Sequence, residues 1–297
     1  MDTFSGNHFN LNVDVISLVL IPHIEAYIRY KIKECITFVH QEYRCTITKR
    51  KAFLGRKRAF EIVYGNWDKS FASLPRCMAA LQYFYPGTFV EWKLERSPEI
   101  PEHIFKYVFW AFKPAIDSFL HCRLVISIDD THVYEKYDIK SLIVVVVDTN
   151  GSIFPLAFAI CVNERQETST LFLNHLKEHV IKQRSGICLI SDRHGSILSS
   201  VQNLRAWQEP YAYHHYCVRH LKANLQKAYP NMDLHDLMWM AAIDHQECLG
   251  ATNYVDKEYS VAAYLNTYSG QLQLVGAEHY WPPEPFKMVC NKDYVRQ

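Results

Sequence analysis

Ile-Ser-Ile-Asp-Asp at residues 126–130 and Leu-Ile-Ser-Asp at residues 189–192 decide how this chain is expected to fold. Each stretch is typical of a short apolar strand that ends in an aspartate. A carboxylate at the end of a buried strand is held rigidly, while its oxygens reach the rim of the sheet. Two such carboxylates on neighbouring strands predict a divalent-metal site formed by Asp129 and Asp192. Carboxylate sites that hold two metal ions cleave and join phosphodiesters.

The residues around the two aspartates predict an alternation of strands and a helix. Thr-Asn-Gly at 149–151 separates two apolar runs and is a hairpin signal, because both turn positions accept positive φ. Phe172, Leu176 and Val180 recur at helical spacing. The expected strands are 123–128, 141–147, 153–162 and 187–191, and the expected helices are 166–182, 194–207, 216–229 and 234–248.

The order strand, strand, strand, helix, strand, helix predicts a mixed sheet. The hairpin makes the first three strands antiparallel neighbours, and the helix lets the fourth strand return parallel to the first by a right-handed crossover. If the fourth strand lies beside the first, Asp129 and Asp192 come close together. This arrangement is the ribonuclease H-like α/β fold.

A helical region is expected from Val13 to about Tyr85. Ile21, Ile24, Ile28 and Ile32 recur at spacings of three and four, which predicts one apolar helix face. A second helix is expected over 49–64, ended by Gly65, and a third over 70–85, interrupted near Pro75.

Residues 86–102 contain several prolines and a short strand-like piece at 89–94, so we place a domain boundary there. The expected organisation is a disordered start at 1–12, a helical region at 13–95, a ribonuclease H-like domain at 104–250 and a tail at 251–297. The tail has strand and turn character but no evident partner in the sequence.

Composition indicates a folded chain with no overall pull toward nucleic acid. Apolar residues make up 49% of the 297 residues, charged residues make up 21%, and the net charge is +1. Any basic surface must therefore be local. The longest strongly apolar run, 142–147, is far shorter than the roughly 20 residues needed to span a bilayer. We expect no membrane association.

Nine cysteines are scattered without Cys-x-x-Cys spacing, and the N-terminus shows no signal-peptide pattern. This use of cysteine predicts reduced thiols in the cytosol or nucleus.

Four short motifs, in order, resemble the transposases of plant Mutator-like elements (MULEs). Residues 127–132 (Ser-Ile-Asp-Asp-Thr-His) are similar to the family's Ile-Asp-Gly-Thr-His motif. Residues 153–159 are similar to its hairpin strand, 190–194 to its second aspartate motif, and 217–220 (Cys-Val-Arg-His) to its Cys-x-x-His motif. Further matches upstream, such as Tyr-Gly-Asn-Trp at 64–67, extend the resemblance over roughly residues 20–250.

The resemblance implies a nuclear DDE enzyme that uses Mg²⁺ or Mn²⁺ to cut DNA and transfer strands at terminal inverted repeats. Asp129 and Asp192 then correspond to the first two metal ligands. Asp130 stands where the family has glycine. This extra carboxylate either perturbs metal binding or faces away, since neighbours on a strand point to opposite sides. The oligomeric state stays open, with a homo-oligomer as one option.

The family's third acid is not found. It is usually a glutamate within Thr-Asn-x-x-Glu-Ser-x-Asn, and Ala-Thr-Asn-Tyr at 251–254 only begins like that stretch. Position 256 is aspartate, and Glu247 and Glu258 have other surroundings. The ligands of a SWIM zinc finger and of the family's N-terminal zinc finger are also missing. We therefore expect a truncated, internally deleted transposase with little or no activity.

The histidines near the motifs admit more than one role. Cys217 and His220 are spaced i, i+3 and are expected on one helix face. Zinc needs four ligands and no second cysteine cluster exists, so we do not expect zinc and favour a packing role. His132 and His194 follow the two aspartates as either partners of the metal ligands or loop residues.

Two basic triplets are candidates for contact with DNA phosphates or for nuclear import. No acidic residue occurs between Tyr43 and Phe60, and the alternative is a plain solvated helix face. The candidate residues are Lys49, Arg50, Lys51, Arg56, Lys57 and Arg58.

Three functional classes remain open at this point. The first is a DDE transposase that has become defective. The second is a DNA-binding or transcriptional regulatory protein derived from a transposase, and the third is a fragment without a stable product. The missing third acid argues against the first, and the missing zinc fingers weaken the second.

Overall fold

The computed structural model describes residues 11–27, 30–134, 138–162, 165–229, 236–237, 266–270 and 275–290. The chain divides into two compact units, Met1–Leu74 and Pro75–Gln297. We expected a boundary at 86–102, but this stretch contains the strand Phe89–Arg96, which pairs with the strand His103–Ala111 in the sheet of the second unit. The division therefore falls earlier in the chain.

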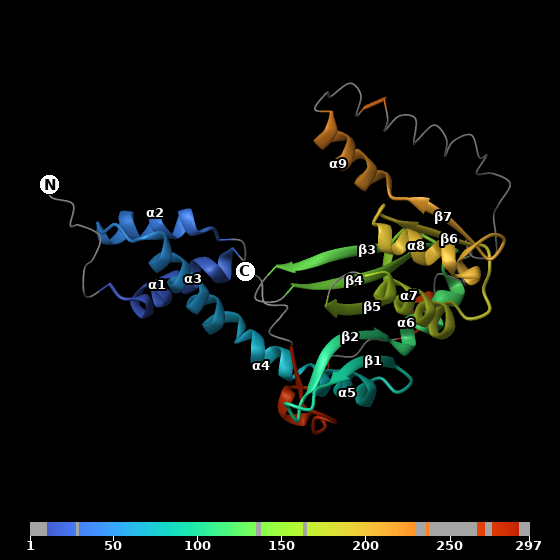
Figure 1. Cartoon of the computed structure of the whole chain (residues 1–297), viewed down its shortest axis with the longest axis horizontal. Helices are drawn as coiled ribbons and strands as arrows, with labels where there is room; N and C mark the ends of the chain where they lie inside the picture. Colours follow the sequence, from blue (N-terminus) through green and yellow to red (C-terminus); the bar gives the residue numbers. More distant parts are fainter. Residues whose placement is uncertain are drawn as a thin grey trace. The chain divides into compact units, whose positions relative to one another are not determined.

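Between residues 125 and 203 the strands and helices follow the alternation that the sequence predicts, and Figure 1 labels most of the elements along the chain. The longer helices are α1 (Val13–Ala26), α2 (Ile32–Tyr43), α3 (Lys49–Tyr64), α4 (Trp67–Ala72), α5 (Leu74–Phe84), α6 (Lys113–Ser118), α7 (Gln166–His175), α8 (Gly195–Asn203) and α9 (Val218–Ala228). The strands are β1 (Phe89–Arg96), β2 (His103–Ala111), β3 (Val125–Tyr134), β4 (Asp138–Val147), β5 (Ile153–Val162), β6 (Ile187–Ser191), β7 (Ala212–Tyr216) and β8 (Met288–Val289).

The first unit is helical, as expected, but Ile21 and Ile32 do not share one helix. Helix α1 ends at Ala26, and Tyr27 is extended. Helix α2 begins at Ile32, where the Glu34 carboxylate accepts a hydrogen bond from the Lys31 backbone N–H at 2.5 Å. This hydrogen bond, from the N-cap backbone to the glutamate three residues later, makes Ile32 the first residue of a new helix. The expected helix over 49–64 is confirmed as α3, and Gly65 ends it at φ 88°.

Small residues let α3 approach α1 closely. Ala52, Gly55 and Ala59 are the buried residues of α3, and they recur at i, i+3 and i+7. A Cβ atom added to Gly55 would lie 2.3 Å from Cγ2 of Ile16 on α1. The core of this unit therefore depends on the missing side chain at position 55.

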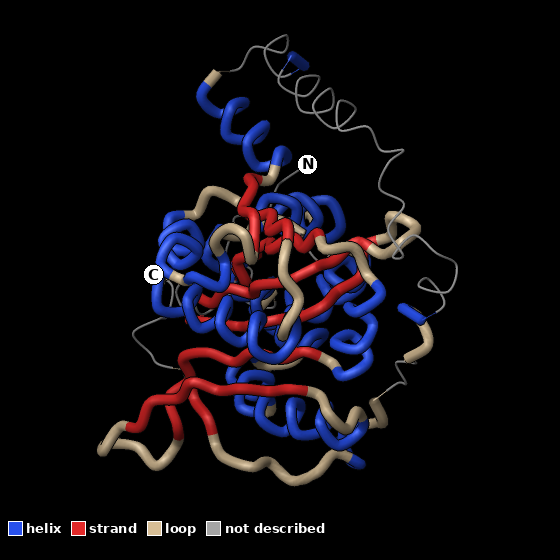
Figure 2. The backbone as a smooth tube through the Cα atoms, turned by 90° about the vertical axis from the view of Figure 1, so that its right-hand side faces the viewer, coloured by secondary structure: helices blue, strands red, loops and turns tan. Residues whose placement is uncertain are grey.

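The second unit is built on one mixed sheet, whose strands are red in Figure 2. Its strand order is β1-β2-β5-β4-β3-β6-β7, and β8 pairs with β2. Strands β3, β4 and β5 are consecutive antiparallel neighbours. Strand β6 pairs in parallel with β3, and β7 pairs in parallel with β6. The predicted hairpin and the predicted parallel return are both confirmed.

The hairpin between β4 and β5 does not use the expected pair of positive-φ residues. Gly151 has φ 84°, and Asn150 is not among the residues with positive φ. The turn is instead organised by Asp148, whose carboxylate accepts from the backbone N–H of Asn150 at 2.8 Å and of Ser152 at 2.7 Å. The side chain before the Asn-Gly pair thus shapes the loop.

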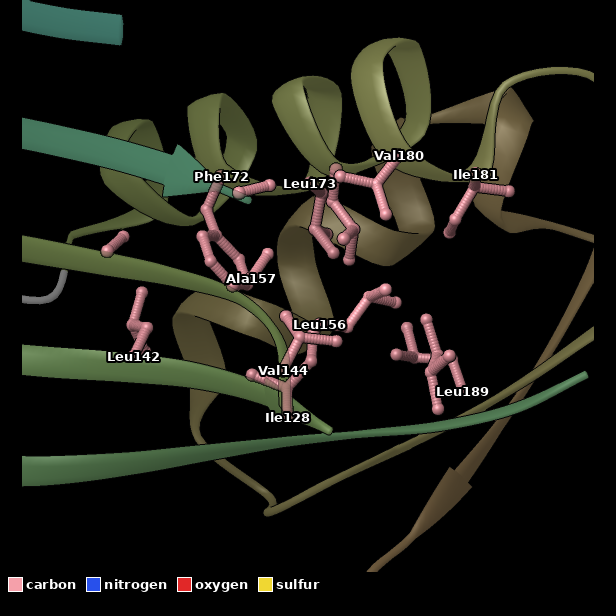
Figure 3. Close-up of a cluster of buried hydrophobic side chains, with 14 of the residues drawn as sticks. Ile128, Leu142, Val144, Leu156, Ala157, Phe172, Leu173, Val180, Ile181 and Leu189 are labelled. Carbon is pink, nitrogen blue, oxygen red and sulfur yellow. The ribbon is translucent and has the colours of Figure 1, made fainter. Parts of the chain in front are cut away.

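The core of the second unit lies between the sheet and α7. Along β4, buried Leu142, Val144 and Val146 alternate with half-buried residues, as the period of two requires. Phe172 and Leu173 of α7 pack against this face, with Val180 and Ile181 of the π-helical continuation Leu176–Ile181 (Figure 3). The expected helix over 166–182 is thus an α-helix followed by a π-helix.

Part of the tail is tied to the second unit. Met288 and Val289 pair in parallel with His103 and Ile104. The Arg76 guanidinium donates to the carbonyl oxygens of Glu278 at 2.8 Å and Pro282 at 3.1 Å. Among the helices that the structure describes, none is long and apolar enough to cross a membrane.

Candidate functional site

Asp129 does not end its strand, contrary to expectation. Strand β3 continues to Tyr134, and Asp129 pairs with Ile143 of β4. On its other side, the pairing of β3 with β6 stops at Ser127–Ile190. Asp129 therefore lies where β6 ends, on a strand held from one side only.

Asp192 occupies the matching position on the neighbouring strand. Strand β6 ends at Ser191, and Asp192 follows at once, as expected. Asp129 and Asp192 each lie two residues beyond the last β3–β6 pair, Ser127–Ile190. The parallel register thus carries both carboxylates to the same edge of the sheet.

A turn and a helix start fix the Asp192 side chain. Its Oδ1 accepts from the backbone N–H of His194 at 3.1 Å. His194 is the N-cap residue of α8, and its Nδ1 lies 2.7 Å from Oγ of Ser196. Ser196 Oγ accepts in turn from Oγ of Ser169 on α7 at 2.9 Å. His194 therefore links the residue after β6 to the packing of α7 and α8.

The Asp129 carboxylate is contacted by the start of α9. The Arg219 guanidinium lies 2.9 Å from Oδ2 of Asp129, and Nε2 of His220 lies 3.6 Å from Oδ1. Arg219 was not singled out from the sequence, although it lies inside the Cys-x-x-His motif. The contact depends on the tertiary placement of α9, which no local pattern indicates.

An open cavity of about 560 Å³ lies beside this cluster. Asp192, His194 and His220 contribute to its walls. The remaining lining residues are Arg193, Leu198, Tyr216 and Asn224. The cavity brings Asp192 together with His220 of α9. It offers a ligand the Asp192 carboxylate, the Arg193 guanidinium and histidine ring nitrogens.

Asp130 has a partner of its own. Nζ of Lys140 on β4 lies 3.2 Å from its Oδ2, and both side chains are largely buried, at 11% and 16% exposure for Lys140 and Asp130. Arg219 and His220 contact Asp129 instead. Of the two roles left open for Asp130, this geometry favours the one in which its side chain faces away from the Asp129 carboxylate. Lys140 was a further residue that the sequence reasoning missed.

Cys217 and His220 do not act as a pair. Cys217 is the N-cap residue of α9, and its backbone N–H donates to the Ser191 carbonyl at 2.7 Å. This bond ties the start of α9 to the end of β6. The His220 side chain reaches Asp129, and its buried Nδ1 has no hydrogen-bond partner among the residues that the structure describes.

Strand β7 supplies a second histidine near β6. Nε2 of His214 lies 2.9 Å from Oγ of Ser191, and burial, together with the neighbouring His215, lowers the pKa of His214. His214 therefore stays neutral near neutral pH. The backbone of His132 lies in β3, but its side chain is outside the described residues.

Asp129 and Asp192 are the oxygen donors at this sheet edge that could hold a divalent ion. Mg²⁺ is commonly held by one or two carboxylates and keeps several waters, and Asp129 and Asp192 supply two carboxylates at one sheet edge. In the part of the chain that the structure describes, no three His, Cys, Asp or Glu side chains gather closely enough to hold a metal. Glu247, Asp256 and Glu258, and the expected helix over 234–248 apart from 236–237, lie outside the described residues.

The basic cluster lies on α3 of the first unit. Arg58 pairs with Asp14 at 2.8 Å, Lys57 lies 4.0 Å from Glu61, and Arg56 stacks over Phe60 and donates to the Tyr30 carbonyl. Lys49 and Arg50 are exposed and Lys51 is half-buried. The first triplet is thus the part of the cluster that offers its charge to solvent.

Comparison with known families agrees with the resemblance at the sheet. Residues 125–224 match the MULE transposase domain, and this segment holds Asp129, Asp192, Cys217 and His220. No curated protein matches the chain. The mixed α/β sheet that carries the two aspartates is therefore similar to the MULE transposase domain, which indicates a transposase-type function and interaction with DNA.

Proposed function

We propose that the chain is a MULE-type DDE transposase in which Asp129 and Asp192 hold Mg²⁺ or Mn²⁺. The observation that carries this proposal is the parallel β3–β6 register, which puts both aspartates two residues beyond the last pair. The strand order β5-β4-β3-β6-β7, with three antiparallel strands followed by two parallel ones, supports a ribonuclease H-like fold. The match over residues 125–224 supports the same family.

Each residue of the site has a separate role in the proposed phosphoryl transfer. Asp129 and Asp192 orient oxygen ligands from one sheet edge, and the His194 N–H keeps Asp192 in place. Bound magnesium supplies charge stabilisation at the phosphate and an activated water or hydroxyl. His220 and Asn224 of α9 line the cavity beside Asp192 and face any phosphate that enters it.

We further propose that cleavage by this chain is weak. A two-metal site stabilises both the attacking and the leaving oxygen, and it needs ligands beyond two aspartates. The third acidic motif of the family is not found in the sequence. With one carboxylate fewer, the ions bind more weakly and lie less well placed.

DNA binding without catalysis is the second candidate function, as in a regulatory protein derived from a transposase. The exposed charges of Lys49 and Arg50 on α3, with half-buried Lys51 beside them, favour it, because phosphate contact needs no metal. In both candidates the working compartment is the nucleus. The DNA target of the ancestral enzyme is the terminal inverted repeat.

A nicking assay on supercoiled and linear DNA tests the proposal. We expect the chain to retard DNA and to nick it, in Mg²⁺ or Mn²⁺, little faster than Asp129→Ala does. Robust nicking that Asp129→Ala abolishes would show that catalysis survives, against the proposed loss. Absence of DNA binding at low salt would contradict both candidate functions.

A further inference from the structure

The Asp129 carboxylate is already paired with a positively charged side chain of the same protein. The Arg219 guanidinium lies 2.9 Å from Oδ2, and Nε2 of His220 lies 3.6 Å from Oδ1. Both oxygens of the proposed first metal ligand therefore face groups of α9. A divalent ion that uses these oxygens meets the guanidinium at the same place.

Helix α9 is attached to the sheet by few contacts among the described residues. None of its side chains is buried, and it follows the edge strand β7. The hydrogen bond from Cys217 N–H to the Ser191 carbonyl holds its start. The Arg219–Asp129 ion pair is thus one of the contacts that set where α9 lies over the site.

The ion pair lies in water and costs little to break. The Arg219 side chain is 72% exposed and that of Asp129 is 43% exposed. Exposed pairs of this kind contribute roughly 0.2–1 kcal/mol. A divalent ion that also binds Asp192 has twice the charge of the guanidinium and a second carboxylate to hold it.

We propose that Arg219 is a positioning residue that competes with the divalent ion for Asp129. Without metal, Arg219 neutralises Asp129 and holds α9 over the sheet edge; with metal, Arg219 is displaced and the start of α9 loosens. The inference rests on the metal site of the proposed function. Linkage is reciprocal. The factor by which the Arg219–Asp129 ion pair weakens binding of the ion is therefore the factor by which the bound ion weakens that ion pair.

Calorimetric titration of the full chain with Mn²⁺ tests the competition. We expect Arg219→Gln to bind Mn²⁺ roughly two- to fivefold more tightly than the unmodified chain, which is the fold-change that an exposed ion pair supports. Arg219→Lys, which restores the charge, should return the affinity toward the original value.

Lys227→Gln is the matched control, because it removes one positive charge from the same helix. Lys227 is exposed and lies eight residues after Arg219, about 12 Å along the helix. This distance exceeds the screening length of roughly 8 Å at physiological salt. We expect its Mn²⁺ affinity to stay within error of the original, and thermal unfolding of both variants to match.

Hydrogen exchange of the α9 amides gives a readout that a purely structural role would not move. Mg²⁺ should speed exchange at 221–225 in the unmodified chain and leave the already faster exchange of Arg219→Gln unchanged. Equal or weaker Mn²⁺ binding by Arg219→Gln than by Lys227→Gln would overturn the competition alone. Absence of Mn²⁺ binding in every variant would overturn the metal site itself, and with it the competition.

Discussion

At the scale of single residues, Asp148 shows how a buried polar side chain can organise a turn. It is fully buried at the end of β4. Burial alone raises the pKa of Asp148, but hydrogen bonds from Tyr268 Oη at 2.6 Å and from two backbone N–H groups outweigh it and lower the pKa. The ionised carboxylate therefore stabilises the loop and holds residue 268 against it.

Asp148→Asn should lower the free energy of unfolding by about 1–3 kcal/mol at pH 7, the cost of losing hydrogen bonds to a charged group. The lowered pKa means that this contribution is complete above the ordinary aspartate pKa of about 3.9 and is lost as pH falls through the folded value. Urea unfolding at pH 7 and pH 3 checks both statements. A difference between the two proteins that grows toward pH 3 would contradict the account.

His175 of α7 offers a second pH test. Burial is the largest influence on its pKa and lowers it, and within the described part of the chain its buried Nδ1 has no hydrogen-bond partner. Its ring lies among Phe89, Tyr107 and Phe109, with centroid distances of 6.1, 5.8 and 5.5 Å. The folded state therefore favours the neutral ring.

The pKa of His175 in the folded state lies below the ordinary histidine value of about 6.5. The free energy of unfolding should therefore be highest above pH 6.5 and fall as the pH is lowered below that value. His175→Phe removes this titration, so its unfolding free energy between pH 7 and pH 5 should fall less than that of the unmodified chain. Thermal unfolding over this pH range measures the slopes. Equal slopes would show that His175 does not contribute.

At the scale of elements, the strands with plain apolar patterns were predicted and the others were not. Strands β5 and β6 match their expected bounds, because each is an apolar run between turn signals. Strand β7 (Ala-Tyr-His-His-Tyr) has no apolar period, and apart from Tyr216, where a helix was expected to begin, it lay in a stretch with no assigned element. Strand β2 lay within a segment with no assigned strand, although it pairs with β1 on one side and β5 on the other.

The sequence predicts that Asp129 and Asp192 lie close together, but it does not predict the side chains that contact them. The strand pattern and the crossover rule suffice to bring Asp129 and Asp192 to one edge. The Arg219 contact requires the start of α9 to reach Asp129 of β3, ninety positions earlier in the chain, and no local period indicates that. The extension of β3 beyond Asp129 was missed because it pairs with β4 on one side only.

Helix packing in the first unit gives an element-scale prediction. Gly55→Ala normally favours a helix by roughly 0.5–1 kcal/mol. At this position, however, the added Cβ would lie 2.3 Å from Ile16, so we expect a net loss of about 1–3 kcal/mol from overpacking. Urea unfolding followed by helical circular dichroism measures it. Leu54→Ala, at an exposed neighbouring position, is the control, and a more stable Gly55→Ala would contradict the close contact.

At the scale of the whole molecule, a nearly neutral chain must bind DNA through local charge. Replacing Lys49, Arg50 and Lys51 by alanine should weaken duplex DNA binding and reduce the slope of log affinity against log salt by about two to three. Replacing Arg58, which pairs with Asp14, should change the slope less. Fluorescence anisotropy at several salt concentrations measures the slopes. An unchanged slope for the triple variant would show that α3 does not contact phosphates.

The central claim is that Asp129 and Asp192 form one divalent-metal site, and Asp130 provides a matched control for it. Asp130 is the neighbour of Asp129 in sequence, but it pairs with Lys140. Mn²⁺ titration by calorimetry of Asp129→Asn, Asp192→Asn and Asp130→Asn tests the claim most directly. The account predicts that the first two variants lose Mn²⁺ binding while Asp130→Asn keeps it. Binding that survives in Asp129→Asn or Asp192→Asn, or that is absent from the unmodified chain, would contradict it.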